Sequence, residues 1–405
     1  MSRAFTPFTL GPLRLRNRIV KAATFEGMCP GGLPSPALVE HHRRVAAGGA
    51  AMTTVAYASV SPDGRSYDTQ LLLGPDAVPG LRKLTDAVHR EGAAASLQVG
   101  HCGDFADRRL AGGRPMGPSR RLNLYGLSVA RPITEGEIGR VVDDFGAAAR
   151  VADAAGFDAI EVHFGHGYLV SQFLSPAINR RRDRWGGSLE NRCRLALEVL
   201  RAVRAAAPRQ AVLCKVNLRD GFPGGLEVDG AVDVARRLES EGAAGLVLSC
   251  GFVSRAPLYM LRGDVPLRPM MDAQKSVWAK AGLFLFGKLL VQQYPYTEAF
   301  LRPDALRMRA AVKLPLVLLG GLKSLGTIDR ALDDGFELVG MGRALLHDPD
   351  LPARMQRGET TASGCVPCNE CIAEMDRGGV RCTRAFESSR LTRLATSRAM
   401  PGSPR

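Results

Sequence analysis

The sequence has no uninterrupted apolar run long enough to cross a lipid bilayer. Its most hydrophobic patch, residues 282–291, is interrupted by Gly287 and Lys288 and is too short to span a membrane. The first residues, MSRAFTPFTLG, lack the apolar region of a secretory signal peptide. From these absences we expect a soluble, cytoplasmic protein without a membrane partner.

The chain also lacks the patterns of a nucleic-acid-binding protein and of a repeat protein. Its net charge is +14, from 54 basic and 40 acidic residues, but the basic residues are scattered rather than grouped with aromatic residues. We therefore expect no nucleic-acid partner, and we attribute the charge to a basic surface and an anionic cofactor or substrate. The sequence has no internal repeat and no GxGxxG motif between a strand and a helix pattern.

What the chain does contain is a regular alternation of short β-rich runs with helix patterns. Apolar residues make up 45% of its 405 residues, which is enough for a large core. We expect strands at residues 19–24, 51–56, 94–99, 159–163, 212–217, 245–249, 316–319 and 338–341. We expect helices near residues 37–47, 79–91, 135–155, 188–207, 228–241, 327–333 and 344–357. Eight such βα units predict an α/β fold, a (β/α)8 TIM barrel.

Two segments depart from this spacing. Residues 104–132 are rich in Gly, Pro and Arg and are interpreted as a long loop over the barrel mouth. Residues 257–315 are too long for one crossover and predict an inserted helical segment over the mouth, or extra core helices away from it. We thus divide the chain into a barrel (1–357), a cysteine-bearing C-terminal extension (358–386) and a disordered tail (387–405).

Polar residues gather where the predicted strands end, which is the catalytic face of such barrels. Gln98 lies at the mouth end of the third strand and Lys215 lies on the fifth, and the end of the fourth is followed by a cluster of His163, His166 and Tyr168. Two glycine-bearing pairs follow the last two strands and can bring backbone N–H groups to a phosphate: Gly320-Gly321 and Gly342-Arg343. Together these groups outline a flat, polar, phosphorylated cofactor, and flavin mononucleotide (FMN) has that shape.

Four of the nine cysteines crowd into a short C-terminal run, Cys365, Cys368, Cys371 and Cys382. The count is odd and the spacing is C-x2-C-x2-C, so this run does not indicate a secreted disulfide framework. Such close thiolates suit an iron–sulfur cubane, whereas zinc sites more often have two separated CxxC pairs. We therefore favour a [4Fe–4S] cluster over zinc, with unligated thiols as the remaining alternative.

Several of these segments resemble the old yellow enzyme family, in the bacterial NADH:flavin oxidoreductase branch with 2,4-dienoyl-CoA reductase and trimethylamine dehydrogenase. The resemblance covers roughly residues 5–385 and is most specific in HGYLVSQFLSP…NRRRDRWGGSLENR. Further matches are Asn17-Arg18-Ile19-Val20, Leu97-Gln98 with His101, the two glycine pairs and the cysteine run. Some family features are missing: Phe25 stands where some relatives have cysteine, and no histidine follows the sixth strand.

The resemblance implies a role for each of these residues. Ala23, Thr24 and Tyr57 would lie among the cofactor-binding residues, and Gln98 would bond the pyrimidine edge of FMN. Lys215 would stabilise the reduced flavin where relatives usually have arginine. His163 and His166 would bind an activating oxygen of the substrate, and Tyr168 would supply a proton. Two-domain relatives ligate a [4Fe–4S] cluster with a run like Cys365–Cys382.

From these features we expect an FMN-dependent enzyme that uses NAD(P)H to reduce the activated C=C bond of a small-molecule alkene. One alternative is an amine-oxidising or dealkylating flavoenzyme that passes electrons through the cluster to a redox partner protein. Another is an electron-transfer subunit with little activity of its own. The sequence leaves open the choice of NADH or NADPH and whether the protein forms a homo-oligomer.

Overall fold

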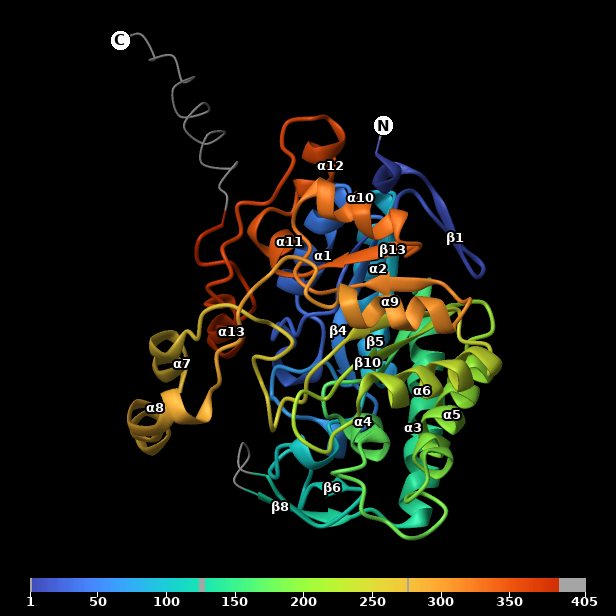
Figure 1. Cartoon of the computed structure of the whole chain (residues 1–405), viewed down its shortest axis with the longest axis vertical. Coiled ribbons are helices and arrows are strands. Elements are labelled where there is room, and N and C mark those ends of the chain that lie inside the picture. Colours follow the sequence, from blue (N-terminus) through green and yellow to red (C-terminus); the bar gives the residue numbers. More distant parts are fainter. Residues whose placement is uncertain (1, 124–127, 275–276, 386–405) are drawn as a thin grey trace.

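The centre of the molecule is a closed barrel of eight parallel strands (Figure 1). The computed structural model describes residues 2–123, 128–274 and 277–385. The barrel strands, in spatial order, are β3 (Ile19–Lys21), β4 (Met52–Ser59), β5 (Ala94–Gly100), β9 (Ala159–Phe164), β10 (Ala211–Asn217), β11 (Gly245–Ser249), β12 (Leu316–Leu318) and β13 (Leu338–Met341). Each overlaps one of the eight strands expected from the sequence, so the predicted TIM barrel is confirmed.

Helices cover the outside of the barrel. They are α1 (Pro36–Ala47), α2 (Val78–Arg90), α3 (Glu135–Ala154), α5 (Leu189–Ala206), α6 (Val228–Ser240), α9 (Arg302–Ala311), α10 (Leu325–Asp333), α11 (Arg343–His347) and α12 (Leu351–Gln356). Side-chain caps fix several starts: Thr134 and Glu137 form a capping box at α3, and Ser188 accepts the Asn191 N–H at α5. The single helix expected over residues 344–357 is two helices, because Pro349 lies between them and cannot continue the helical hydrogen bonding.

The core has two parts because side chains of a strand alternate between its two faces. On β9, Ile160, Val162 and Phe164 point outward into a large core shared with the helices, whereas Ala159 points into the barrel. An antiparallel hairpin, β1 (Phe8–Leu10) and β2 (Leu13–Leu15), closes the barrel at the end where the parallel strands begin. This hairpin was not predicted from the sequence. Its Leu10 and Leu15 are fully buried against the strand starts.

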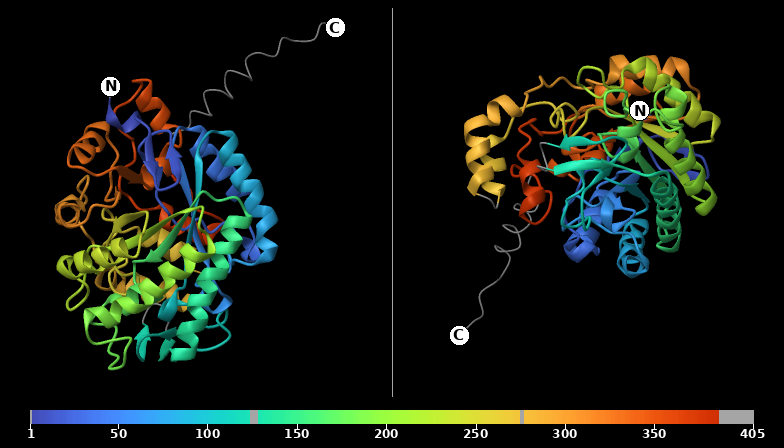
Figure 2. Two further views of the ribbon diagram at one scale, coloured as in Figure 1. Left: turned by 90° about the vertical axis from the view of Figure 1, so that its right-hand side faces the viewer. Right: turned by 90° about the horizontal axis from the view of Figure 1, so that it is seen from below.

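The two irregular segments, residues 104–132 and 257–315, contain regular structure. In residues 104–132 the short strands β6 (Met116–Gly117), β8 (Ser128–Pro132) and β7 (Arg121–Asn123) form a small sheet. A further short helix outside this segment, α4 (Leu169–Leu174), follows β9. Residues 257–315 contain α7 (Leu267–Ala273), α8 (Val277–Leu290) and α9. Figures 1 and 2 show α7 and α8 as a pair beside the barrel. None of the described helices combines the length and apolar character that crossing a bilayer requires.

The cysteine-bearing extension lies against the barrel mouth. Its backbone bonds to three parts of the chain: Ser363 N donates to Lys323 O (2.8 Å), Asp264 N to Pro367 O (2.9 Å) and Val380 N to Glu26 O (2.7 Å). The extension contains α13 (Cys371–Glu374), which contacts α7. Short 3-10 turns complete the structure: η1 (Arg3–Phe5), η2 (Pro30–Gly32), η3 (Pro62–Gly64), η4 (Pro75–Ala77), η5 (Gly103–Phe105) and η6 (Met375–Arg377). The tail predicted at residues 387–405 lies outside the described residues.

Candidate active site

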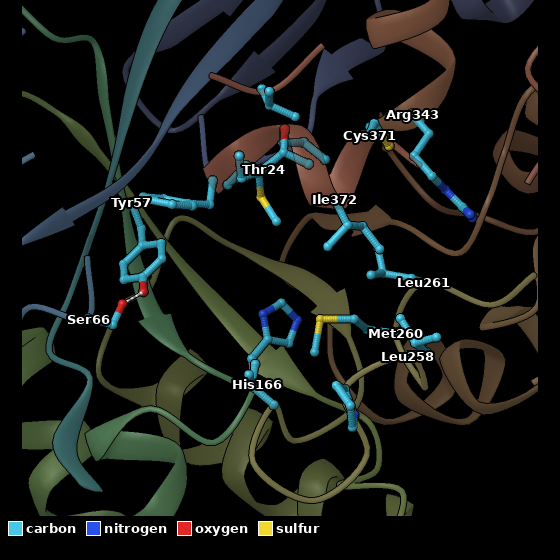
Figure 3. A pocket seen from close by; sticks show the side chains of 18 of the residues that line it. Thr24, Tyr57, Ser66, His166, Leu258, Met260, Leu261, Arg343, Cys371 and Ile372 are labelled. Atoms are coloured by element: carbon cyan, nitrogen blue, oxygen red, sulfur yellow. Dashed lines mark hydrogen bonds between the residues drawn. The ribbon is translucent and has the colours of Figure 1, made fainter. Parts of the chain in front are cut away.

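A cavity of about 1300 Å³ opens at the C-terminal ends of the barrel strands (Figure 3). This exceeds the roughly 300–1,000 Å³ of typical ligand pockets, so a flavin and a second molecule can share it. Every residue predicted to be catalytic or to bind the cofactor lines this cavity: Ala23, Thr24, Tyr57, Gln98, His163, His166, Tyr168, Lys215, Gly320, Gly321, Gly342 and Arg343. The structure thus brings the set together, while the individual roles remain predictions.

A buried polar triad lies at one part of the cavity wall, where two of its members, Gln98 and Lys215, line the cavity. Gln98 on β5, Glu161 on β9 and Lys215 on β10 all point into the barrel, and each is at most 3% exposed. Gln98 Nε2 donates to Glu161 Oε1 at 2.5 Å, and Lys215 Nζ lies 2.8 Å from the same oxygen. Glu161 therefore fixes both side chains that are predicted to meet the flavin, and it neutralises part of the Lys215 charge. Its inward direction follows from strand alternation, which was the available sequence signal.

The two histidines meet because the chain turns sharply after β9. His166 has a φ of 58° and Gly167 a φ of 79°, both in the left-handed region. A Cβ on Gly167 would lie 2.4 Å from the Phe252 ring, so this position needs glycine. The turn brings the His163 and His166 rings to a centroid distance of 4.8 Å, in an edge-to-face arrangement. Both rings therefore face the same cavity.

Hydrogen bonds define the orientation of both imidazoles. The Gly165 N–H donates to His163 Nδ1 at 3.2 Å, so a neutral His163 carries its proton on Nε2. His166 Nε2 lies 2.7 Å from Ser249 Oγ, and the His166 backbone N–H donates to Asn217 Oδ1 at 3.0 Å. Ser249 and Asn217 were not predicted as site residues. Their place at the ends of β11 and β10 could have identified them.

The electrostatics of the site keep both imidazoles neutral. Burial lowers the pKa of His163 well below its usual value, and the neighbouring His166 and Lys215 lower it further. Burial, together with the charge of Lys215, lowers the pKa of His166 to about 3. A neutral imidazole that donates one N–H can polarise a substrate oxygen without adding a net charge to the site.

Aromatic rings form the wall next to the histidines. The Tyr168 ring lies 4.6 Å from His163 and 4.9 Å from Tyr57, measured between centroids. The Tyr57 hydroxyl bonds to Ser66 and lies 3.5 Å from the Cys102 sulfur. Burial raises the pKa of Tyr57 well above its usual value, so this phenol stays protonated. Figure 3 shows Tyr57 and His166 entering the cavity from one side and Arg343 and Cys371 lying across it.

The opposite end of the cavity has the donors that a phosphate needs. Gly320 and Gly321 have φ values of 111° and 79°, and Gly342 precedes the first turn of α11. Among the described residues, none accepts a hydrogen bond from the N–H of Gly321, Gly342 or Arg343. Arg343 Nη1 donates to Arg262 O at 2.9 Å and to Asn369 Oδ1 at 2.5 Å. With Gln98 and Lys215 at the other end, this donor set fits FMN.

A buried charged cluster that the sequence analysis missed supports the loop after β3. Lys21 Nζ lies 2.9 Å from Glu26 Oε1, and Glu26 Oε2 accepts the Ala56 N–H at 2.8 Å. His42 lies 3.5 Å from Glu26 and is fully buried, although its helix pattern alone would have suggested a surface position. The cluster holds the chain that leads to Ala23 and Thr24. Because Lys21 already neutralises Glu26, we interpret the cluster as structural rather than as a metal site.

The four predicted metal ligands lie in the extension, and all are partly exposed free thiols. Cys365 and Cys371 also line the cavity, and Cys382 Sγ lies 3.6 Å from His347 Nδ1. Burial and the neighbouring thiols raise the pKa of Cys371 to about 12. Thiols in this environment become thiolates only when a cation offsets their charge, and metal binding supplies one.

Comparison with known proteins identifies relatives of about the same length as this chain and relatives about twice as long. A 4,4'-dithiodibutanoate disulfide reductase of Rhodococcus erythropolis is 45% identical over 380 residues, which are 93% of this chain and 94% of that protein. An N,N-dimethylglycine/sarcosine dehydrogenase of Chromohalobacter salexigens is 32% identical over 95% of this chain. This chain spans 53% of that protein, or about half of its length.

Comparison with solved structures and with sequence profiles also identifies flavin-dependent oxidoreductases as relatives. The structure of a morphinone reductase superposes with a TM-score of 0.70 at 25% identity, over 90% of this chain and 92% of that one. The sequence profile of the NADH:flavin oxidoreductase / NADH oxidase family matches residues 3–241, more than half of the chain. With its barrel, its flavin-compatible cavity and these matches, the chain belongs to the NADH:flavin oxidoreductase family, which includes the old yellow enzymes.

Proposed function

We propose that this flavin-dependent NADH oxidoreductase reduces the activated C=C bond of a small electron-poor alkene. The observation that carries the proposal is the meeting of His163, His166 and Tyr168 at one cavity, with both imidazoles neutral. FMN, when bound, supplies a hydride that it has received from NAD(P)H. The chain itself must then orient the alkene, stabilise developing negative charge and deliver one proton.

The imidazole pair is suited to stabilise the negative charge that develops on the substrate oxygen. The carbonyl or nitro oxygen of an activated alkene becomes negative as the hydride arrives at the β-carbon. In this proposal His163 donates its Nε2–H to that oxygen, and His166, held by Ser249 and Asn217, supports it from the adjacent edge. One donor at such a position contributes about 3 kcal/mol to transition-state stabilisation.

Tyr168 is the proposed proton donor to the α-carbon. Its ring lies edge-on to His163, so a substrate bound at the histidines also approaches the phenol. A phenol has an ordinary pKa near 10 and therefore holds its proton at neutral pH. The overall change is one hydride and one proton added across the double bond, with oxidation of one NAD(P)H.

Anaerobic turnover tests the proposal. Protein saturated with FMN is mixed with NADH or NADPH and an N-alkylmaleimide or cyclohexenone, and consumption of both substrates is measured. We expect one alkene reduced per reduced nicotinamide oxidised, and Tyr168→Phe should lower kcat by about 10²-fold or more. Failure of the FMN-loaded protein to reduce any electron-poor alkene would refute the proposal.

A second candidate reaction is reduction of an organic disulfide to two thiols. It is favoured by the 45% identity to the 4,4'-dithiodibutanoate disulfide reductase over nearly the full length of both chains. The two reactions differ in their need for Tyr168, because a thiolate leaves without protonation more readily than a carbon centre does. Tyr168→Phe should therefore impair alkene reduction and spare disulfide reduction. A wild type with a much higher kcat/KM for an organic disulfide than for any electron-poor alkene would favour the disulfide as substrate.

We further propose that Cys365, Cys368, Cys371 and Cys382 bind a [4Fe–4S] cluster. Zinc–sulfur bonds of about 2.3 Å would place the thiolates of a zinc site about 3.8 Å apart. In the described part of the chain, the only three His, Cys, Asp or Glu ligand atoms within 4.8 Å of one another belong to Glu26, His41 and His42. The thiols are thus more widely spread than zinc requires, which favours the larger cubane.

A bound iron–sulfur cluster would also allow electrons to leave the flavin for a partner protein, instead of passing from NAD(P)H to a substrate. The similarity to a dimethylglycine/sarcosine dehydrogenase favours, as the alternative, amine oxidation with electrons passed through the cluster to a partner protein. Oxidation of a methylated amine with an artificial acceptor, without turnover of alkenes or disulfides, would support that alternative. An inactive protein that nonetheless exchanges electrons with a redox partner would indicate an electron-transfer subunit.

A further inference from the structure

The rim of the cavity carries more positive than negative charge, although two carboxylates, Asp68 and Asp107, also line it. Three arginines outside the predicted flavin contacts line it: Arg108, Arg109 and Arg255. Arg109 pairs with Asp107. In the ranges that the structure describes, neither Arg108 nor Arg255 forms an ion pair, and both are exposed. A concave site with unpaired charge of one sign attracts a ligand of the other sign.

The segment that carries Arg255 is fixed to the histidine pair. The Val253 N–H donates to His166 O at 2.9 Å, and Phe252 forms a β-bridge with His166. The Arg255 N–H in turn donates to Phe252 O at 2.9 Å. The backbone of Arg255 thus keeps a set position relative to His166.

A buried ion pair holds the same segment from the other side. Arg121 Nη1 lies 2.8 Å from Asp104 Oδ2, and its Nη2 donates to Ser254 Oγ at 2.8 Å. Asp104 forms its ion pair with Arg121, whereas Arg255 acts on this carboxylate only from a longer distance and forms no ion pair with it among the described residues. Its guanidinium lies 5.9 Å from the centroid of the Phe222 ring, which limits its directions and leaves its donors available.

We infer that the substrate of this site carries a carboxylate, and that Arg255 binds this carboxylate while the reducible group contacts His163 and His166. This inference rests on the proposed function. The planar guanidinium fork matches a carboxylate through two parallel hydrogen bonds. No glycine-rich donor loop accompanies Arg255 among the described residues, and such a loop is what a phosphate-bearing group would call for. Arg255 is then a specificity-determining residue.

A matched pair of substrates tests the inference. 3-Maleimidopropanoate and N-propylmaleimide have the same reacting double bond, and only the former has a carboxylate. We expect the wild type to prefer the carboxylate substrate at low ionic strength. The ratio of the two kcat/KM values should fall at least tenfold in Arg255→Gln, mainly through KM, and should be partly kept in Arg255→Lys.

A control variant separates local binding from net charge. Arg236→Gln removes the same charge from α6, where Arg236 lies near Asp233 and away from the cavity lining. It should leave the substrate ratio within twofold of the wild type. Equal losses on both maleimides in Arg255→Gln, or a wild type without preference, would overturn the inference. A change confined to the KM for NADH would do the same, because Arg255 would then bind the nicotinamide cofactor.

A binding measurement keeps this test independent of the proposed reaction. 3-Succinimidopropanoate has the carboxylate but no reducible double bond, and its dissociation constant can be followed by the change in flavin absorbance. We expect Arg255→Gln to weaken its binding at least tenfold. If neither maleimide is reduced while this analogue binds through Arg255, alkene reduction is wrong but the carboxylate site stands. If the maleimides are reduced and the analogue binds both proteins equally, the carboxylate site is wrong.

Discussion

At the scale of single residues, the neutral state of His166 makes a prediction about stability and pH. The folded protein holds the His166 pKa at about 3, whereas an unfolded histidine titrates near 6.5. Between these values the unfolded chain binds a proton that the folded chain does not. The free energy of unfolding must therefore decrease as the pH falls below about 6.5, by up to about 1.4 kcal/mol per pH unit from this residue.

The variant His166→Asn lacks this titration. We expect its destabilisation relative to the wild type to be largest at pH 8 and to shrink by about 1–2 kcal/mol at pH 5, as followed by urea unfolding at saturating FMN. The pH 8 measurement is the internal control, since both states then hold a neutral ring. A constant difference between the two proteins across this range would contradict the neutral assignment.

The pair of Lys215 and Glu161 supports a second prediction. Both side chains are almost fully buried, so removal of the ammonium in Lys215→Met leaves a carboxylate without its counter-charge. Such a change costs about 3–5 kcal/mol of unfolding free energy. Adding Glu161→Gln should restore most of this loss without restoring FMN affinity, because Gln98 and Lys215 are the predicted flavin contacts.

Chemical denaturation of the apoprotein and FMN titration measure the two effects separately. Lys215→Arg serves as the matched control, since it keeps the charge at the position where relatives carry arginine. It should bind FMN and keep most of the stability. A loss below 1 kcal/mol in Lys215→Met, or no recovery in the double variant, would show that the pair does not act as a unit.

At the scale of elements, the hairpin β1–β2 is the piece that closes the barrel. Leu10 is fully buried among the strand starts, while Thr9 beside it is exposed. Leu10→Ala should lower the free energy of unfolding by about 2–5 kcal/mol through the cavity it leaves. Thr9→Ala should change it by less than about 0.5 kcal/mol. Similar losses in both variants, measured by chemical denaturation, would mean that the hairpin does not plug the barrel.

This hairpin also marks what the sequence could not predict. The eight barrel strands were predicted because buried parallel strands are continuous apolar runs with helices between them. The hairpin strands are only three residues each, and the runs have no periodicity that distinguishes them from a loop. The small sheet over residues 104–132 was missed for the same reason, since its strands are short and depend on tertiary contacts.

The candidate site also contains residues that were predictable from the sequence and partners that were not. Gln98, His163 and Lys215 were predictable, because strand alternation and strand ends place them at the mouth. The partners that orient them depend on contacts between segments far apart in sequence, such as Ser249 with His166. The Lys21–Glu26–His42 cluster escaped prediction because a helix pattern does not show which of two adjacent histidines faces the core.

At the scale of the whole molecule, the extension joins the cysteine run to the cavity. Its backbone bonds to residues near Lys323, Asp264 and Glu26, and Cys365 and Cys371 line the same cavity as Arg343. A cluster bound there would lie beside the flavin site and would also hold the extension to the barrel. Loss of one ligand should therefore change both metal content and the order of residues 358–385.

The variant Cys368→Ser tests this coupling, since Cys368 is a proposed ligand that does not line the cavity. Anaerobically purified wild type should contain about four iron atoms per chain, and the variant should lose most of them while it still binds FMN. Limited proteolysis should then cleave the extension faster. Cys193→Ala, a buried change on α5, is the control and should keep its iron. Zinc in place of iron, or unchanged iron in Cys368→Ser, would contradict the assignment, because a cubane held by four thiolates cannot lose one without weakening its hold on the metal.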